Sequence, residues 1–126
     1  MKKVIVASSP QFLEAKKIVE QVLTKLDKIL GLGDKYLEVY LVSDAFMKKN
    51  VLSFEASKDF PHPETKKYQP LGEIYLNPKY IQENNEDLTY MLVHGLLHLL
   101  GYDHKNKSDR MKMEAEEQRL CRAIKS

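Results

Sequence analysis

The sequence predicts an α+β fold: a single domain over residues 1–126 in which a small mixed β-sheet of about four strands is covered by helices. Three observations predict it. Short runs of β-branched and aromatic residues alternate with segments of helical periodicity. A length of 126 residues suits one domain with its own core. The chain contains neither an internal repeat nor a low-complexity segment that would divide it.

The N-terminal third predicts a strand, a long helix and a second strand. Residues 2–7 (KKVIVA) have strand composition, and the Ser8-Ser9-Pro10 sequence that follows offers an N-cap and a proline suited to a first helical turn. Apolar side chains then recur at three- and four-residue steps over residues 11–30, which predicts an amphipathic helix. Gly31 and Gly33 end this pattern, and residues 36–42 (YLEVYLV) predict the next strand.

The middle of the chain predicts two short strands that flank a long loop. Ser43 and Asp44 can cap a short helical turn that runs through Lys49, and residues 51–54 (VLSF) predict a strand. Residues 55–70 carry three prolines and little periodicity, so we expect a loop. The strand signal returns over residues 71–76 (LGEIYL).

The C-terminal part predicts helices. They are a helical turn over residues 77–82, a helix over residues 88–100 and a final helix over residues 109–124. Asp87 or its neighbour Asn85 can cap the second of these, Gly101 ends it, and Ser108 is the expected cap of the third.

Composition and charge exclude some classes of function. The net charge of +2 is too small to indicate a nucleic-acid-binding protein by itself, and no apolar run approaches the roughly 20 residues that cross a membrane. The apolar residues 4–7 are too few for the core of a secretory signal. The lone Cys121 can form no internal disulfide, which favours a reducing compartment, so we expect a cytoplasmic protein without membrane association.

The segment HGLLHLLGYDH contains three of the four histidines of the chain. Four helical residues advance about 6 Å and turn through about 400°, which places His94 and His98 on one face. Gly101 allows the chain to reverse after the helix and bring His104 back as a third ligand. This H-x-x-x-H-x-x-G-x-x-H spacing is that of metzincin zinc sites, so we expect His94, His98 and His104 to hold one Zn²⁺ ion with an open fourth position.

Gly95 and Asp103 bear on the chemistry of this expected zinc site. Zinc peptidases of the H-E-x-x-H type carry their general base where this chain has Gly95, so peptide hydrolysis by that mechanism is disfavoured. Asp103 precedes the third histidine and is a candidate catalytic residue, either as an acceptor for a ligand N–H or as a helper for bound water; a role in stabilising the turn is equally compatible. His62, between two prolines, is not expected to be a ligand.

The same motif closely resembles the H-G-x-L-H-L-x-G-Y-D-H signature of the YbeY family of bacterial ribosomal-RNA maturation endoribonucleases. Further segments resemble the family's V-L-S-F, L-G-D-I and M-x-x-x-E-x-x-L motifs; they are residues 51–54, 71–74 and 113–120. The resemblance implies a zincin-like layout and zinc-dependent cleavage of single-stranded RNA, by attack of water or of the adjacent 2′-hydroxyl. It also implies a role in maturing the 3′ end of small-subunit ribosomal RNA and in ribosome quality control, with ribosomal RNA and the small ribosomal subunit as partners.

Two segments depart from the family pattern. Family members usually carry an arginine and a Thr-Asp pair just before V-L-S-F, whereas this chain has Lys48, Lys49 and Asn50. Lys48 or Lys49 could therefore supply a catalytic charge, with Lys49 as the candidate residue, although a lysine offers no bidentate fork to a phosphate; merely solvated lysines are an equal alternative. Glu73 replaces the family's Asp and is a further candidate catalytic residue, as a polar group near the cleft. The alternative is that Glu73 is an ordinary strand residue that faces outward.

Two other functions are compatible with the sequence. One is a metal-dependent hydrolase of another class, such as a peptidase or an ester hydrolase, against which Gly95 argues. The other is a non-enzymatic ribosome-binding factor in which a structural metal only ties the last two helices together, a function favoured by the missing arginine.

Overall fold

The computed structural model describes residues 1–57 and 68–125, and most of the predicted 55–70 loop, with His62, lies outside these residues. The chain forms an α+β domain, as the sequence predicts. Its elements are β1 (Lys2–Ala7), a 3-10 turn (Pro10–Phe12), α1 (Leu13–Leu30), β2 (Lys35–Leu41), β3 (Val51–Glu55), β4 (Gln69–Leu76), α2 (Pro78–Glu83), α3 (Leu88–Leu99) and α4 (Lys107–Lys125).

The four strands form one mixed sheet in the order β1-β2-β4-β3. β1 pairs in parallel with β2, and β2 pairs in parallel with β4. β3 runs antiparallel to β4 and forms one edge of the sheet. Because α3 contacts both β3 and β4, this edge lies next to the helix that carries two of the three clustered histidines.

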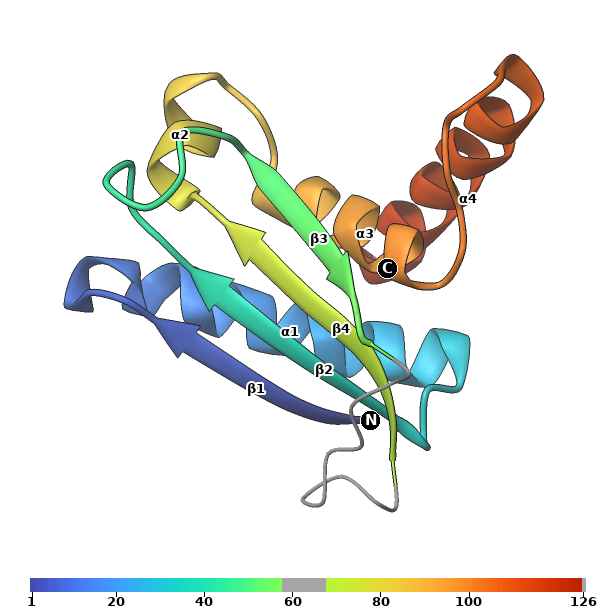
Figure 1. The fold of residues 1–126 in the computed structure, drawn as a ribbon, viewed down its shortest axis with the longest axis horizontal. Coiled ribbons are helices and arrows are strands. Elements are labelled where there is room, and N and C mark those ends of the chain that lie inside the picture. The colour runs from blue at the N-terminus through green and yellow to red at the C-terminus, as the bar shows by residue number, and fades with distance from the viewer. Residues whose placement is uncertain (58–67, 126) are drawn as a thin grey trace.

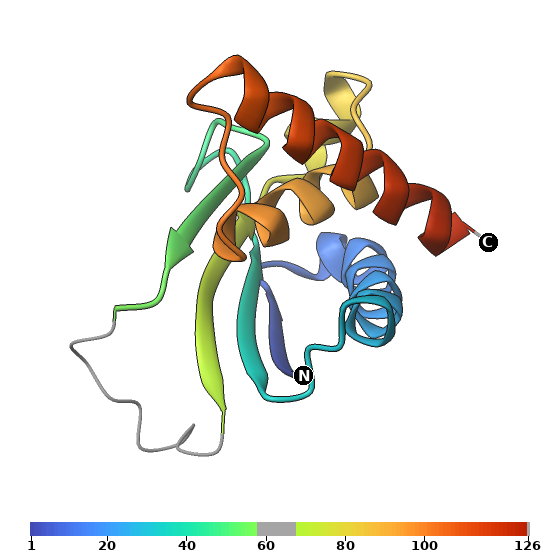
Figure 2. The ribbon, with the colours of Figure 1, turned by 90° about the vertical axis from the view of Figure 1, so that its right-hand side faces the viewer.

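The helices cover a single face of the sheet (Figures 1 and 2). Alternate side chains of the central strands are fully buried beneath α1 and α3; they are Leu37, Val39, Leu41, Ile74 and Leu76. The opposite face, formed by the other set of alternating side chains, carries a stack of Tyr40 on Tyr75 with ring centroids 5.0 Å apart. Any site built from helices must therefore lie on the α1 and α3 side.

The C-terminal end of α1 follows the predicted signal, whereas the helix begins at Leu13 and not at residue 11. Pro10 takes the first position of the 3-10 turn, but Ser9 makes no side-chain capping bond there. At the other end Gly31 adopts φ 63°, and its N–H donates to the carbonyl of Asp27 at 2.9 Å. A positive φ suits glycine because it has no Cβ, which explains why the helix stops at this residue.

Two local predictions need correction. The residues after β2 form only one turn, in which the Met47 N–H donates to the Ser43 carbonyl at 3.0 Å, and the turn does not reach Lys49. α4 begins at Lys107, so Ser108 lies inside the helix instead of capping it. The cap is Asn106, whose side-chain oxygen accepts from the Asp109 N–H at 2.8 Å.

The start of α3 is fixed by Asp87 rather than by Asn85. The Asp87 carboxylate accepts from the Thr89 N–H at 3.0 Å, which satisfies one of the unpaired donors of the first turn.

No helix in the described part of the chain combines the length and apolarity needed to span a membrane.

Candidate metal centre

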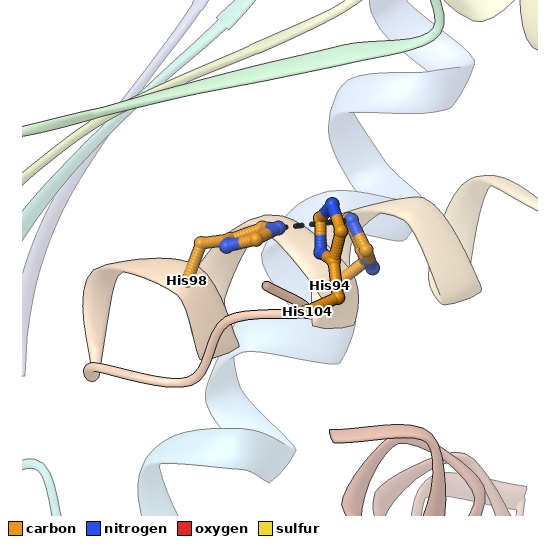
Figure 3. Close-up of side chains that lie close together, drawn as sticks. All are labelled: His94, His98 and His104. Atoms are coloured by element: carbon orange, nitrogen blue, oxygen red, sulfur yellow. Dashed lines mark hydrogen bonds between the residues drawn. The ribbon is translucent and has the colours of Figure 1, made fainter. Parts of the chain in front are cut away.

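The three clustered histidines converge, as the spacing predicts (Figure 3). His94 and His98 lie one turn apart on α3, and their Nε2 atoms are 3.1 Å apart. His104 approaches from the loop that follows α3, with its ring centroid 5.1 Å from that of His98. One ligand nitrogen from each histidine lies within 4.8 Å of the other two, so the three residues could hold a metal ion.

The loop that supplies His104 depends on Gly101. This residue has φ 103°, a conformation that side chains with a Cβ rarely adopt. Its N–H donates to the His98 carbonyl, and the Tyr102 N–H donates to the Leu97 carbonyl at 3.0 Å. These bonds close the end of α3 and reverse the chain, and His104 thereby lies opposite the histidines of the helix.

Glu117 on α4 is a site residue that the sequence reasoning did not single out. Its side chain is 2% exposed, and its Oε2 atom lies 2.5 Å from His94 Nδ1. The Tyr90 hydroxyl donates to its other oxygen at 2.9 Å. A carboxylate on Nδ1 selects the tautomer with a free lone pair on Nε2, the atom that faces His98.

A signal for Glu117 was present in the sequence. Met113 and Leu120 are apolar core positions of the last helix, and Glu117 lies four residues after the first and three before the second. It therefore shares their face of the helix. A carboxylate in a buried stripe is rarely left without a partner, so the position itself indicates a polar contact across the core.

The electrostatics of the cluster favour the neutral form of His98. Burial, followed by the neighbouring His94 and His104, lowers the pKa of His98 below its usual value. Burial and the hydrogen bond to Glu117 raise the pKa of Tyr90 to about 12, so this phenol remains a donor to Glu117 at neutral pH. Neutral imidazoles are the form that binds metals, and an all-nitrogen set of three suits Zn²⁺ among other first-row ions.

Two cavities meet at the histidines. The first, which we call the β3 cavity, has a volume of about 590 Å³ and is lined by all three histidines together with Lys49, Ser53, Glu55, Asp103 and Lys105, among others. The second, the α4 cavity, has a volume of about 350 Å³ and is lined by His94, His104 and residues of α3 and α4 that include Tyr90, Met91, Arg110, Met113, Glu114 and Glu117. A ligand at the histidines therefore has room on both sides.

Two of the three candidate catalytic residues lie at this site. Lys49 and Asp103 both line the β3 cavity. Asp103 also accepts a hydrogen bond from the Lys105 N–H at 3.2 Å, so it stabilises the turn around His104. The structure thus brings both residues close to the histidines.

Glu73 does not join them, because it lies on the face of the sheet that the helices leave open. The next residue along β4, Ile74, points into the core, so Glu73 points the other way. Its carboxylate accepts from the Tyr75 hydroxyl at 2.7 Å, and this bond, followed by burial, raises the pKa of Tyr75 to about 12. The expectation that Glu73 is a polar group of the cleft is therefore wrong, and its outward-facing alternative is correct.

Gly95 allows α3 to approach the edge strand closely. A Cβ at this position would lie 3.0 Å from the Ser53 hydroxyl oxygen and 3.1 Å from a methyl group of Ile74. The Ser53 hydroxyl donates to the Gly95 carbonyl at 3.1 Å. The glycine thus serves packing against β3 and β4, and a longer side chain here would meet the sheet.

Comparisons with known proteins agree with this geometry. Residues 48–125 match the family model described as Endoribonuclease YbeY. The chain is similar to Endoribonuclease YbeY of Thermotoga maritima, with 31% identity over 119 residues that cover 82% of this chain and 77% of the relative. Endoribonuclease YbeY of Anaplasma marginale is 32% identical to this chain over 123 residues, which cover 82% of this chain and 75% of the relative.

A solved structure supports the fold independently. The solution structure of TM1509 from Thermotoga maritima superposes with a TM-score of 0.62 at 23% identity, and the match covers 97% of this chain and 88% of that one. The sequence motif, the converging histidines and the matches over most of the chain lead to one conclusion. The chain belongs to the YbeY family.

Proposed function

We propose that this protein is a zinc-dependent, single-strand-specific endoribonuclease that acts in ribosomal RNA maturation, at the 3′ end of small-subunit ribosomal RNA, and in ribosome quality control. Its partners would be ribosomal RNA and the small ribosomal subunit, in the cytoplasm. The observation that carries the proposal is the histidine triad at the junction of two cavities, in a chain that belongs to the YbeY family.

The residues of the chain have separable roles in this proposal. His94, His98 and His104 would hold the ion, and Glu117 keeps His94 in the ligating tautomer. When bound, zinc supplies Lewis-acid stabilisation of negative charge that develops on the phosphate. Lys49 adds a positive charge to the β3 cavity, where a phosphodiester would be attracted to it.

The packing of Gly95 supports phosphodiester chemistry over peptide hydrolysis. A glutamate at this position would have to enter the space occupied by Ser53 and Ile74. The site has no general base where the H-E-x-x-H peptidases carry theirs.

The ends of the RNA products would identify the nucleophile. Release of a 2′,3′-cyclic phosphate would identify the 2′-hydroxyl as the nucleophile, whereas linear phosphate ends would identify water.

The test compares RNA cleavage and metal content in the same protein samples. The wild type should bind about one zinc ion per chain and cleave single-stranded ribosomal RNA fragments, because three ligands suffice for a catalytic site. His98→Ala should lose both properties, while His62→Ala, which changes the histidine outside the motif, should keep both.

Several outcomes would contradict the proposal. Cleavage of RNA by metal-free His98→Ala protein would remove the metal from the reaction. Cleavage of a peptide library without cleavage of RNA would favour the hydrolase of another class. Sedimentation with ribosomes that survives His98→Ala, without any nuclease activity in the wild type, would favour the non-enzymatic binding factor.

A further inference from the structure

The α4 cavity contains an arginine next to the histidine triad. The chain has three arginines, Arg110, Arg119 and Arg122, and all three lie on α4. Arg110 lines the α4 cavity together with His94 and His104. Arg119 donates to the Glu116 carboxylate, and neither Arg119 nor Arg122 is among the residues that line the α4 cavity or the β3 cavity.

The position of Arg110 on the helix directs it towards α3. It begins the stripe 110, 113, 114 and 117, whose spacing of three and four residues defines one helical face. All four members line the α4 cavity, and Met113 and Glu117 are 2% exposed. The first turn is fixed by the Asn106 cap and by the Arg110 N–H, which donates to the Asn106 carbonyl at 3.0 Å.

The guanidinium of Arg110 is available to a ligand. Within residues 1–57 and 68–125, no carboxylate forms an ion pair with it, although Glu114 lies one turn further along and lines the same cavity. The other carboxylate of the cavity, Glu117, is already bound by His94 and Tyr90. A guanidinium offers two parallel N–H donors, a geometry that matches two oxygens of one phosphate.

The remaining walls of the cavity suit a nucleotide. Val51, Met91 and Met113 provide apolar surface and Tyr90 provides an aromatic ring. The volume of about 350 Å³ lies within the range of small-molecule sites. An RNA strand that runs from the β3 cavity past the histidines would place one nucleotide in the α4 cavity, with a phosphate close to Arg110.

We propose that Arg110 binds a phosphate of the RNA strand on the α4 side of the metal, next to the scissile phosphate. This inference rests on the proposed function and names the residue that fixes the strand in one of the two cavities. Arg110 contributes to binding of the RNA strand and not to the reaction itself, so its loss raises KM more than it lowers kcat. The zinc ligands are unchanged by its substitution, so the metal content stays at the wild-type level.

The experiment compares Arg110→Met, Arg110→Lys and Arg119→Met, all loaded with zinc. Arg119→Met is the matched control because it removes the same charge from the same helix and breaks only an ion pair with Glu116. Each variant is assayed for kcat and KM on a single-stranded oligoribonucleotide. Binding is measured by fluorescence anisotropy on a 2′-O-methylated analogue at several salt concentrations.

Arg110→Met should raise KM and the dissociation constant about tenfold or more, the effect of losing a charge-assisted hydrogen bond. Its salt dependence should flatten by about 0.7 in the slope of log K against log salt, which corresponds to one phosphate contact on a single strand. Arg110→Lys should fall between this variant and the wild type, because it keeps the charge but loses the fork. Arg119→Met should stay within about twofold of wild type.

Two results would overturn the inference. If Arg110→Met binds and cleaves like Arg119→Met, the arginine makes no contact with the strand, whatever the wild type does to RNA. If the zinc-loaded wild type neither binds nor cleaves the oligonucleotides, the proposed function fails together with the inference. A wild type that binds without cleaving contradicts only the endonuclease activity, and binding by the three arginine variants still decides the role of Arg110.

Discussion

Replacing Glu117 by glutamine tests the link between α4 and the metal centre. The substitution keeps the size of a side chain that is 2% exposed but removes its charge. Both carboxylate oxygens are in use, one at 2.5 Å from His94 Nδ1 and one at 2.9 Å from the Tyr90 hydroxyl. Glutamine has a single acceptor oxygen for these two donors, so one contact must be lost or reversed.

The expected loss is in metal affinity. A carboxylate behind a ligating histidine fixes its tautomer and raises its basicity, and removal of such a partner weakens metal binding about 10- to 100-fold. This range corresponds to about 1.4–2.7 kcal/mol of binding free energy. We expect Glu117→Gln to lie in the range, because the amide oxygen can still accept from one of the two donors.

The assay is a competition titration of Zn²⁺ against a chromophoric chelator, with circular dichroism to verify that the variant is folded. Glu116→Gln is the matched control, since it makes the same change one residue earlier on α4, where the carboxylate pairs with Arg119. Equal zinc affinities for the two variants would refute the reasoning that Glu117 supports His94 as a ligand.

Three further predictions concern the turn, the metal and pH. Gly101→Ala places a Cβ on a residue with φ 103° and should lower the free energy of unfolding in urea by about 1–3 kcal/mol. Gly33→Ala is the control, because Gly33 has no positive φ and a Cβ there would have no atom within 4 Å, so it should not lower this free energy. Equal effects of the two substitutions would show that the positive φ of Gly101 is not what requires glycine. Zinc at about 100 times its Kd should raise the unfolding free energy by about 2.7 kcal/mol, and a shift of that size in His98→Ala would place the ion elsewhere. The pKa of Tyr90 rises from 10.0 to about 12 on folding, so its contribution to stability is complete below pH 10 and is lost as the pH rises towards 12. Tyr90→Phe should therefore lose less stability than the wild type between pH 9 and about pH 12, as measured by urea unfolding; identical losses would contradict the assigned pKa.

The elements were predictable because hydrophobic periodicity reports which face of a segment is buried. Residues 2–7 were predicted as a strand and form β1 with the same bounds. The histidine triad was equally accessible, since its geometry depends on one helix and one glycine turn. Patterns within single segments were therefore enough to predict these features.

The remainder depends on contacts between distant segments. Glu117 acquires its role only because α4 packs across α3 and meets a residue 23 positions earlier. Alternation along β4 indicates that Glu73 and Ile74 face opposite ways, but not that the helices and the site occupy the Ile74 side alone. Ser108 was the predicted cap of α4, but the helix begins one residue before it and Asn106 provides the cap.

The connection between α3 and α4 would make the metal affinity of the histidine triad depend on how these two helices pack. His104 lies on the loop that joins the two helices, and Glu117 reaches His94 from the second helix. An ion bound by the three histidines would therefore oppose sliding of α4 along α3, and by thermodynamic reciprocity such sliding would reduce the affinity for the ion. Leu120 is fully buried and shares the inner face of α4 with Glu117, so its packing would influence the metal affinity although it contacts no ion.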